Sequence, residues 1–357
     1  MKNLVVAGTV RSPRVKVLID GDLLQGVESA EIEANSHRQA DTFHLKVAFN
    51  TGFKPIDWWM SQDRHDTQLD IRILMDGDEQ SLIIGRPDEI MYEPEQGILN
   101  ISGRDLSGLL QDTPAEGAFQ NQTSSEIATA MANKVGLTPV VTATKGDARR
   151  YYGSTHTHVH HKRGSSNDTA WNVLSKLADD EGYDLYVSGN ELHFEPEPDP
   201  TTLEPYGIHW DQDNANKSNV MALTVSSQLH VAAKKVVVEV QSWASQQGHG
   251  LKAISPAGAS TKGAKVYPYR RPNMTQAQAQ AFADQKYTEI TKHGFTLDFQ
   301  CPGELNLTCR DAVQLSGLGD AAQLYFVDSI RREISMSDGF QQTVALKNKH
   351  PDAEAQP

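Results

Sequence analysis

The residues whose types and spacing most clearly suggest chemistry form a histidine-rich run. His156, His158, His160 and His161 lie together in the segment 154–162. In an extended strand alternate side chains share one face, so the first three could hold a metal ion together. A metal site also needs further ligands and residues that orient them; the sequence assigns none, and two basic residues follow the run. We therefore interpret it as a polar strand or loop, and the sequence predicts no metal, catalytic or cofactor-binding residue and no cofactor.

No other motif in the sequence specifies a catalytic centre. The segment 211–216 starts like a calcium-binding loop, but Ala222 stands where such a loop needs glutamate. The sequence has no nucleophile elbow, phosphate-binding loop or zinc-protease motif. Trp58 and Trp59 could form a platform for a sugar ring, although an adjacent pair more often has one ring in the core and one at an interface. A hydrolase and a carbohydrate- or receptor-binding β protein stay open as alternative functions.

The charge balance argues against binding to nucleic acids or membranes. The 357 residues include 33 Lys and Arg against 46 Asp and Glu, a formal net charge of −13 at pH 7. Such a surface repels phosphate backbones and anionic lipid surfaces. No apolar run is long enough for a signal peptide or a membrane-spanning helix, so we expect no stable membrane insertion. Cys301 and Cys309 are too few for a disulfide framework, and we expect two reduced thiols rather than a disulfide between them.

The elements that would carry these residues begin with β-structure in residues 1–112. Apolar and polar residues alternate in 42–49 and 69–75, with the period of half-buried strands. Asp76 and Gly77 then supply a hairpin turn. Several short strands at this spacing predict a small β barrel or β sandwich over residues 1–112.

Residues 113–205 change character and predict an α/β insert domain. Ser and Thr at 123–125, with Glu126, open a helix that ends at Gly136. A second helix, capped by residues 166–168, ends at Gly182. Its apolar side chains share one face: Trp171, Leu174, Leu177 and Ala178. A hairpin over 183–194 and an acidic, proline-rich linker over 195–200 complete this part.

Residues 206–350 return to strand patterns and predict a second β domain. We expect strands near 220–226, 235–240, 295–300, 312–316, 324–330 and 342–346. A loop and helix insertion interrupts them at about 241–293: a mobile Gly/Ser/Lys-rich loop over 244–263 and a Gln/Ala-rich helix over 275–293. Residues 351–357 form a polar tail. The two β blocks suggest a coarse duplication, because each holds a strand, a turn marked by glycine and another strand.

Three segments together carry a resemblance to a known family. They are SGRDLSGLL followed by Asp112, then SNDTAWNVLSKLADDEGY ending at Tyr183, and finally YFVDSI with DGF and TVAL, ending at Leu346. Their order spans nearly the whole chain. In this order the chain resembles the late control protein D family of contractile-tail phages, the baseplate hub proteins, and the related N-terminal part of type VI secretion VgrG.

The resemblance implies a mainly β fold with an α/β insert. It makes residues 1–112 a first β-barrel domain and residues 206–350 a second β-barrel domain of a tail-tube-like hub, with an inserted α/β domain over 113–205 and a Gln/Ala-rich helix. It implies a structural protein rather than an enzyme, and it transfers no catalytic residue. Three copies would form a homotrimeric ring of six similar barrels, which joins the six-fold tail tube to a three-fold membrane-piercing spike. VgrG chains continue into a spike of their own, whereas this sequence stops at Pro357, so we expect a separate spike protein.

The same resemblance implies partners and a location. The partners are further copies of the chain, the tail spike protein, tail tube or tube-initiator proteins, baseplate wedge proteins and the tape measure protein. The location is the tail baseplate of a virion, assembled in the host bacterial cytoplasm. We expect exposed strand edges to pair between subunits. An acidic lumen would let DNA pass without specific binding, because like charges repel.

Overall fold

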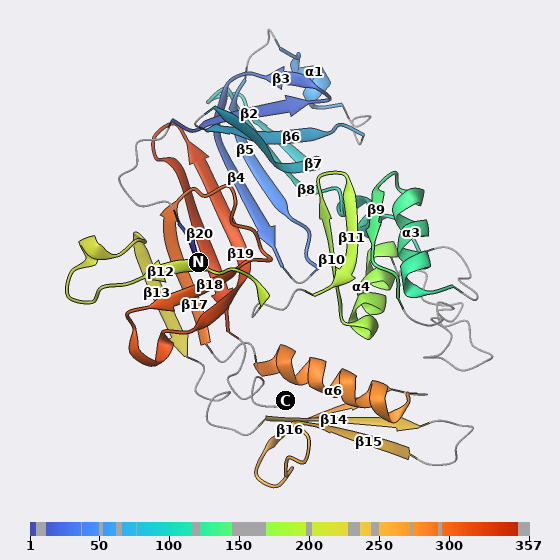
Figure 1. Ribbon diagram of the computed structural model, residues 1–357. Coiled ribbons are helices and arrows are strands. Elements are labelled where there is room, and N and C mark those ends of the chain that lie inside the picture. Colours follow the sequence, from blue (N-terminus) through green and yellow to red (C-terminus); the bar gives the residue numbers. More distant parts are fainter. Residues whose placement is uncertain are drawn as a thin grey trace.

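The chain is mainly β with an α/β insert, which confirms the predicted fold class (Figure 1). The computed structural model describes residues 1–4, 12–36, 38–49, 53–61, 66–75, 77–115, 122–144, 169–197, 202–227, 236–243, 250–271, 274–291 and 295–348. The histidine run 156–161 and the tail 351–357 lie outside these residues. The predicted domain boundaries themselves stay predictions. None of the helices in the described residues has the length and hydrophobicity that spanning a bilayer requires.

The first β unit forms the upper part of Figure 1. Its elements are β2 (Arg14–Ile19), β3 (Asp22–Leu24), β4 (Val27–Asn35), β5 (Thr42–Ala48), α1 (Ile56–Trp59), β6 (Leu69–Met75), β7 (Asp78–Glu93) and β8 (Ile98–Asp105). All neighbouring strands are antiparallel, in the order β4-β5-β8-β7-β6-β2-β3. The alternation predicted from the sequence is present, since every second side chain of β5 and β6 is buried. Those of β5 share one core with Leu69 and Ile71 of β6, whereas Ile73 and Met75 pack with Leu305, Ile334 and Phe340 of the second unit.

Two glycines let a ring lie flat in this core. Phe43 of β5 packs beside Gly85 of β7 and Gly103 of β8. A Cβ added at either glycine would meet the Phe43 ring, at 2.9 Å and 2.8 Å, and also a backbone carbonyl of the neighbouring strand. Glycine is therefore required at both positions by close packing rather than by an unusual backbone angle.

The second β unit is assembled from distant parts of the chain. Its elements are β1 (Lys2–Asn3), β12 (Tyr206–His209), η3 (Ala215–Lys217), β13 (Ala222–Ser227), β17 (Phe295–Pro302), β18 (Ala312–Ser316), η4 (Gly319–Ala321), β19 (Leu324–Ser335) and β20 (Gly339–Lys347). The strands run β13-β17-β20-β19-β18-β12-β1. Leu297, Phe299, Tyr325 and Val344 are at most 1% exposed and belong to its core.

The α/β insert has a separate core. Its elements are α2 (Gly108–Asp112), α3 (Ser124–Lys134), β9 (Thr138–Val141), α4 (Ala170–Glu181), β10 (Tyr183–Ser188) and β11 (Glu191–Pro196). The capping box of Thr123 and Glu126 opens α3 as predicted. The predicted face of α4 is buried, and Gly182 ends this helix with φ +71°.

Two details of the insert differ from the sequence prediction. The cap of α4 is Thr169, whose hydroxyl accepts a hydrogen bond from the Asn172 amide at 3.3 Å; the predicted caps, 166–168, lie outside the described residues. The predicted linker over 195–200 is also partly wrong, because Glu195 and Pro196 continue β11 and pair with β10. Pairing with a neighbouring strand thus overrides the linker-like composition.

A third small sheet corrects the predicted content of the second barrel. It contains β14 (Val236–Trp243), β15 (Gly250–Ser255) and β16 (Lys265–Arg270), with α6 (Gln276–Thr291) lying across it (Figure 1). The strand expected at 235–240 therefore pairs outside the barrel. The loop expected over 244–263 contains β15, because Ala253 and Ser255 are buried once β15 pairs with β14. The Gln/Ala-rich helix is present, and its Ala279, Phe282 and Ala283 form the core with β14.

Candidate assembly surface

The two β units repeat one strand order. The neighbours run β4-β5-β8-β7-β6-β2 in the first unit and β13-β17-β20-β19-β18-β12 in the second. The order along the chain matches as well, from β2, β4, β5, β6, β7, β8 to β12, β13, β17, β18, β19, β20. One difference is that β2 is antiparallel to β6, whereas β12 is parallel to β18. The duplication suggested by the sequence is present in the structure.

A bulged aspartate with a cationic partner marks the same position in both units. The register of β7 and β8 shifts at Asp88, and the register of β19 and β20 shifts at Asp328. Arg104 of β8 donates two hydrogen bonds of 2.8 Å to the Asp88 carboxylate. Lys347 of β20 places its Nζ 2.6 Å from Asp328 Oδ2. The two bulges therefore align the repeats residue by residue.

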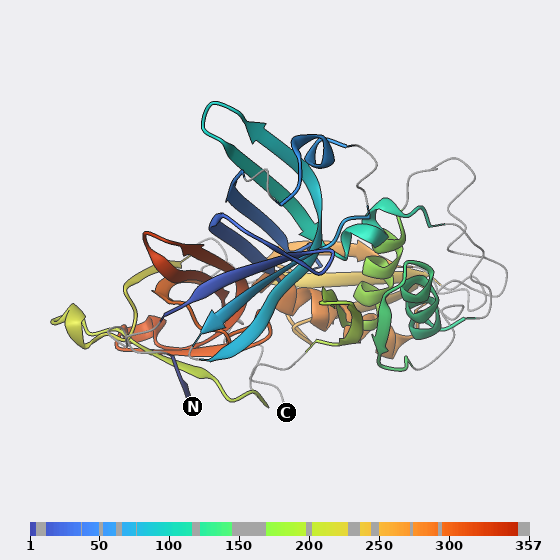
Figure 2. The same ribbon diagram turned by 90° about the horizontal axis from the view of Figure 1, so that it is seen from above.

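One continuous antiparallel sheet joins the repeats. Residues 29–35 of β4 pair with residues 329–335 of β19, so the strands run β7-β8-β5-β4-β19-β20-β17-β13. Both cores lie on one side of this sheet, because the register at the junction sets the buried Ala30 and Ile32 of β4 opposite the buried Ile334 and Arg332 of β19. Its opposite side, here called the outer face, packs against neither core. Seen from above in Figure 2, the blue strands of the first unit lie between the red strands of the second unit and the green helices of the insert.

The outer face carries more acidic than basic side chains. The acidic residues on it are Glu28, Glu31, Glu33, Asp88, Glu89, Glu93, Asp298, Asp328 and Glu333, and the basic ones are Lys46, Arg86, Arg104, Arg331 and Lys347. Arg331 bridges the two units, with nitrogens 2.9 Å from carboxylate oxygens of Glu31 and Glu333. A shallow hollow of about 330 Å³ on this face is lined by Glu31, Glu33, His44 and Glu89, among others. The face is polar and on balance negative.

Arg38, in the turn between β4 and β5, attaches the α/β insert to the first unit. Its Nη1 donates to Asp179 Oδ1 at 2.7 Å and to the Ser175 carbonyl at 3.1 Å, and its Nη2 donates to the Tyr183 carbonyl at 2.9 Å. The Trp171 indole in turn donates to the Arg38 carbonyl at 3.0 Å. Arg38 has φ +59°, a strained angle that these four bonds hold.

The end of α4 also binds the third sheet. Asp179 lies 3.5 Å from Lys286 Nζ of α6, and Asp180 lies 3.4 Å from an Arg271 nitrogen. Burial alone would raise the pKa of Asp179, but the hydrogen bond and charge of Arg38, with the charge of Lys286, lower this pKa below its usual value. Asp179 is therefore an ionised link between three parts of the fold.

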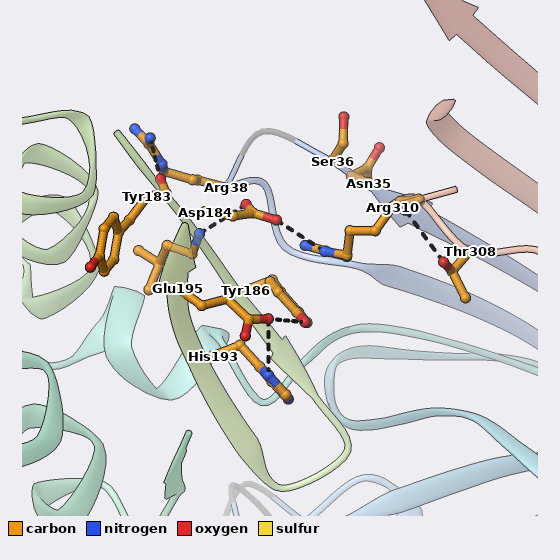
Figure 3. Close-up of polar contacts among 12 residues, drawn as sticks. Asn35, Ser36, Arg38, Tyr183, Asp184, Tyr186, His193, Glu195, Thr308 and Arg310 are labelled. Atoms are coloured by element: carbon orange, nitrogen blue, oxygen red, sulfur yellow. Dashed lines mark hydrogen bonds and ion pairs between the residues drawn. The ribbon is translucent and has the colours of Figure 1, made fainter. Parts of the chain in front are cut away.

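Arg310 attaches the insert to the second unit (Figure 3). Its Nε donates to Asp184 Oδ2 of β10 at 3.0 Å, and its guanidinium carbon lies 3.2 Å from the centre of the Tyr186 ring. The other face of Tyr186 stacks on His193, with centroids 4.4 Å apart. The Tyr186 hydroxyl donates to Glu195 at 2.9 Å. This stack holds the edge of the insert against the loop that precedes β18.

Buried carboxyl groups lie where the first unit meets the insert. Asp105, at the end of β8, is 6% exposed, and its amide donates to the Asp41 carbonyl at 2.8 Å. Burial, and then the charge of Asp41, raise the pKa of Asp105 to about 7. Burial raises the pKa of Asp41 to about 6, although the Asn35 amide and the charges of Arg310 and Arg332 oppose this rise.

The structure resolves several of the sequence interpretations. Trp59 is 4% exposed in the core and Trp58 packs edge-on against it at 5.0 Å, so neither forms an open platform for a sugar. Cys301 and Cys309 are both buried free thiols, as expected. The segment that starts at Asp211 forms a turn in which the carboxylate accepts two backbone amides at 3.0 Å.

Metal chemistry has no support in the described part of the chain. Within it, no group of three or more His, Cys, Asp or Glu side chains is placed to hold a metal ion. His156, His158, His160 and His161 lie outside the described residues, so their interpretation as a polar strand or loop stays a prediction. The residues of the assembly surface and of its attachments, such as Arg38 and Arg310, were not singled out by the sequence, because single arginines in turns carry no recognisable pattern.

Comparison with solved structures gives the fold. The chain is similar to a tail protein from Neisseria meningitidis MC58, with a TM-score of 0.69 and 17% identity over 94% of this chain and 97% of that one. It is equally similar to the 43 kDa tail protein of prophage MuSo2 from Shewanella oneidensis, with a TM-score of 0.68 and 17% identity over 96% and 99% of the two chains. A chain of the Francisella PdpA-VgrG complex matches with a TM-score of 0.54 and 11% identity over 97% of this chain and 59% of that one.

Sequence comparison adds no closer relative. Neither a scan against protein-family models nor a search of curated protein sequences gave a match. The structural matches nonetheless confirm, at the level of fold, the resemblance found in the sequence. The chain has the fold that phage tail proteins share with type VI secretion VgrG.

Proposed function

We propose that the chain is a structural hub protein in the baseplate of a contractile phage tail or of a phage-like injection particle. Three copies form a pseudo-six-fold ring that joins the tail tube to a three-fold spike. The observation that carries this proposal is the repeat: one chain holds two β units of the same strand order, paired side by side through β4 and β19. A trimer of such chains presents six similar units to a six-fold tube and three chains to a three-fold spike.

The attachments of the insert support a rigid hub. Arg38 and Arg310 fix the α/β insert to the two β units, and the end of α4 links it to the third sheet. The insert and the third sheet lie beside the strands of the two β units in Figure 1, and the residues that line the hollow on the outer face all belong to the first β unit. The insert and the third sheet are thus placed to meet other proteins, and we assign the tail spike protein, tail tube or tube-initiator proteins, baseplate wedge proteins and the tape measure protein as partners.

The outer face of the continuous sheet would line the lumen of this ring. Its excess of acidic side chains supports passage of DNA without specific binding. The assembled protein is expected not to retard double-stranded DNA in a gel at low salt, at which electrostatic binding is strongest. Retardation that disappears as salt is added would contradict an acidic lumen.

The proposed function is tested in purified particles. Gold-labelled antibodies against the chain should mark only the end of the tail that carries the spike, and quantitative mass spectrometry should give three copies for each tail. Label along the length of the tube, or copies in proportion to tube length, would assign the chain to the tube instead. Its absence from the particle would refute a structural role. No specific observation favours the hydrolase or the carbohydrate-binding alternative.

A further inference from the structure

The continuous sheet ends in two strand edges without a partner in the described part of the chain. There, β13 pairs only with β17, and residues 89–93 of β7 pair only with β8. An unpaired edge is a template for another strand, and proteins usually protect it with charges or proline. β13 reads ALTVSS, with no charge and no proline. Its edge is therefore unprotected.

The junction between β4 and β19 shows how one repeat pairs with the next. Its register places Arg331 opposite Glu33, and Arg332 opposite Ile32. The aligned repeats then translate this junction. The bulges make Arg104 of β8 equivalent to Lys347 of β20. From these two residues, the pairing of β8 with β5 and of β5 with β4 corresponds to the pairing of β20 with β17 and of β17 with β13, so β4 is equivalent to β13. In the same way β7, which pairs with β8, is equivalent to β19, which pairs with β20.

The equivalence between the repeats can be given residue by residue. Through the pairings of neighbouring strands, Glu33 is equivalent to Ser226 and Ile32 to Val225. Arg331 corresponds to Met91 and Arg332 to Tyr92. The partner of Arg331 thus predicts the partner of Met91.

We propose that residues 90–93 of β7 pair with residues 224–227 of β13 in a second copy of the chain, antiparallel and with Met91 opposite Ser226. This inference rests on the proposed ring and identifies the interface that closes it. Each chain offers β13 to one neighbour and β7 to the other, so the contact is heterologous and every β unit meets the next through the same kind of junction.

The side chains of the two edges suit this pairing. On the core side Tyr92 would meet Val225, and both already pack partly buried against the cores of their own units. On the outer face Met91 is 51% exposed, and its counterpart Ser226 is small and also exposed. Glu93 would lie opposite Thr224, so no like charges oppose each other.

The proposal is tested by a disulfide across the expected pair. Paired residues of antiparallel strands have Cα atoms about 4.5–5.5 Å apart, within the range that a disulfide spans. The full-length double variant Met91→Cys with Ser226→Cys is oxidised and run on a non-reducing gel, and the mass of the same sample is measured by light scattering. The matched control is Met91→Cys with Ala222→Cys, which shares the exposed face of β13 but lies about 13 Å further along the strand. The buried native thiols are present in both variants.

The expected result is covalent dimers and trimers, but no larger products, in the Ser226 variant, with at least about tenfold less covalent product in the control. A trimer that forms no disulfide in either variant overturns this interface and leaves the ring intact. A trimer that links only through the control pair overturns the register. A ladder of products beyond the trimer supports the strand pairing but refutes a closed ring of three. A monomer without covalent products refutes both proposals.

Discussion

Replacing the buried carboxyl group at Asp105 by an amide is expected to stabilise the protein at alkaline pH more than at acidic pH. Asp105 Oδ1 accepts a hydrogen bond from the Ser107 amide at 3.2 Å and another from the Ser107 hydroxyl. An asparagine at this position keeps an oxygen acceptor and nearly the same volume. The substitution Asp105→Asn therefore removes the charge and little else.

The sign follows from the pKa of the group. Burial and the charge of Asp41 raise the pKa of Asp105 from 3.8 to about 7 in the folded protein, so the folded state binds this proton more tightly than the unfolded state. The resulting stabilisation is complete below pH 3.8 and is lost as pH rises through 7. At 1.36 kcal/mol per pH unit, the wild type loses roughly 2–3 kcal/mol between pH 5 and pH 8 through this group.

The assay is urea unfolding of wild type and Asp105→Asn at pH 5 and pH 8. Because the chain has several cores, it need not unfold in a single step. Unfolding of the first β unit is therefore measured by hydrogen exchange of the β8 amides at each urea concentration, not by a signal from the whole chain. The variant should gain roughly 2–3 kcal/mol over the wild type on going from pH 5 to pH 8. The control Asp112→Asn removes a nearby charge that is 68% exposed. If wild type and Asp105→Asn change in parallel with pH, the reasoning is refuted.

Three further predictions concern packing, attachment and thiol chemistry. Gly103→Ala should destabilise the first β unit by about 1–3 kcal/mol, because the new methyl group overfills the space beside Phe43; an unchanged urea midpoint would contradict this. Arg38→Ala removes a charged hydrogen bond to Asp179, weakening attachment of the insert by about 2 kcal/mol; hydrogen exchange in α4 should speed up, and unchanged exchange would argue against the junction. Burial raises the pKa of Cys301 to about 11 and of Cys309 to about 12, so a thiol reagent at pH 8 should label them only after unfolding; rapid labelling of the native protein would show that they are accessible.

Local patterns predicted the elements that depend on local chemistry. The period-two alternation of β5 and β6 reports a half-buried sheet whichever strands lie beside it. The caps of α3 at Thr123 and of α4 at Gly182 depend only on residues within one turn of the helix, so a few neighbouring residues are enough to predict them. The order of three sequence segments added the fold through resemblance.

Features that depend on distant pairing could not be predicted in the same way. β15 has a loop-like composition and becomes a strand because β14 lies beside it. The β4–β19 junction pairs Asn35 with Ser329. These residues are far apart in the sequence, and neither segment contains a pattern that predicts which strand it pairs with. The positions of Arg38 and Arg310 in the attachments depend on the same long-range arrangement. The assembly surface therefore emerged from the structure, although its strands were largely predicted.

The two sides of the continuous sheet differ in what they contact. The core side holds the two β units rigid, and the outer face presents an acidic polar surface that continues from one unit to the next. The insert and the third sheet are bound to this frame through Asp179 and Arg310. Such a division suits a ring whose inner surface must not bind what passes through it.

The native mass of the purified chain tests the proposed hub most directly. Light scattering is measured for the chain alone and again with its candidate spike protein. The account predicts three copies of the chain in each particle. For the chain alone this is a mass three times 39.3 kDa, and with the spike protein the mass of the spike is added. A strict monomer in both samples would contradict the ring.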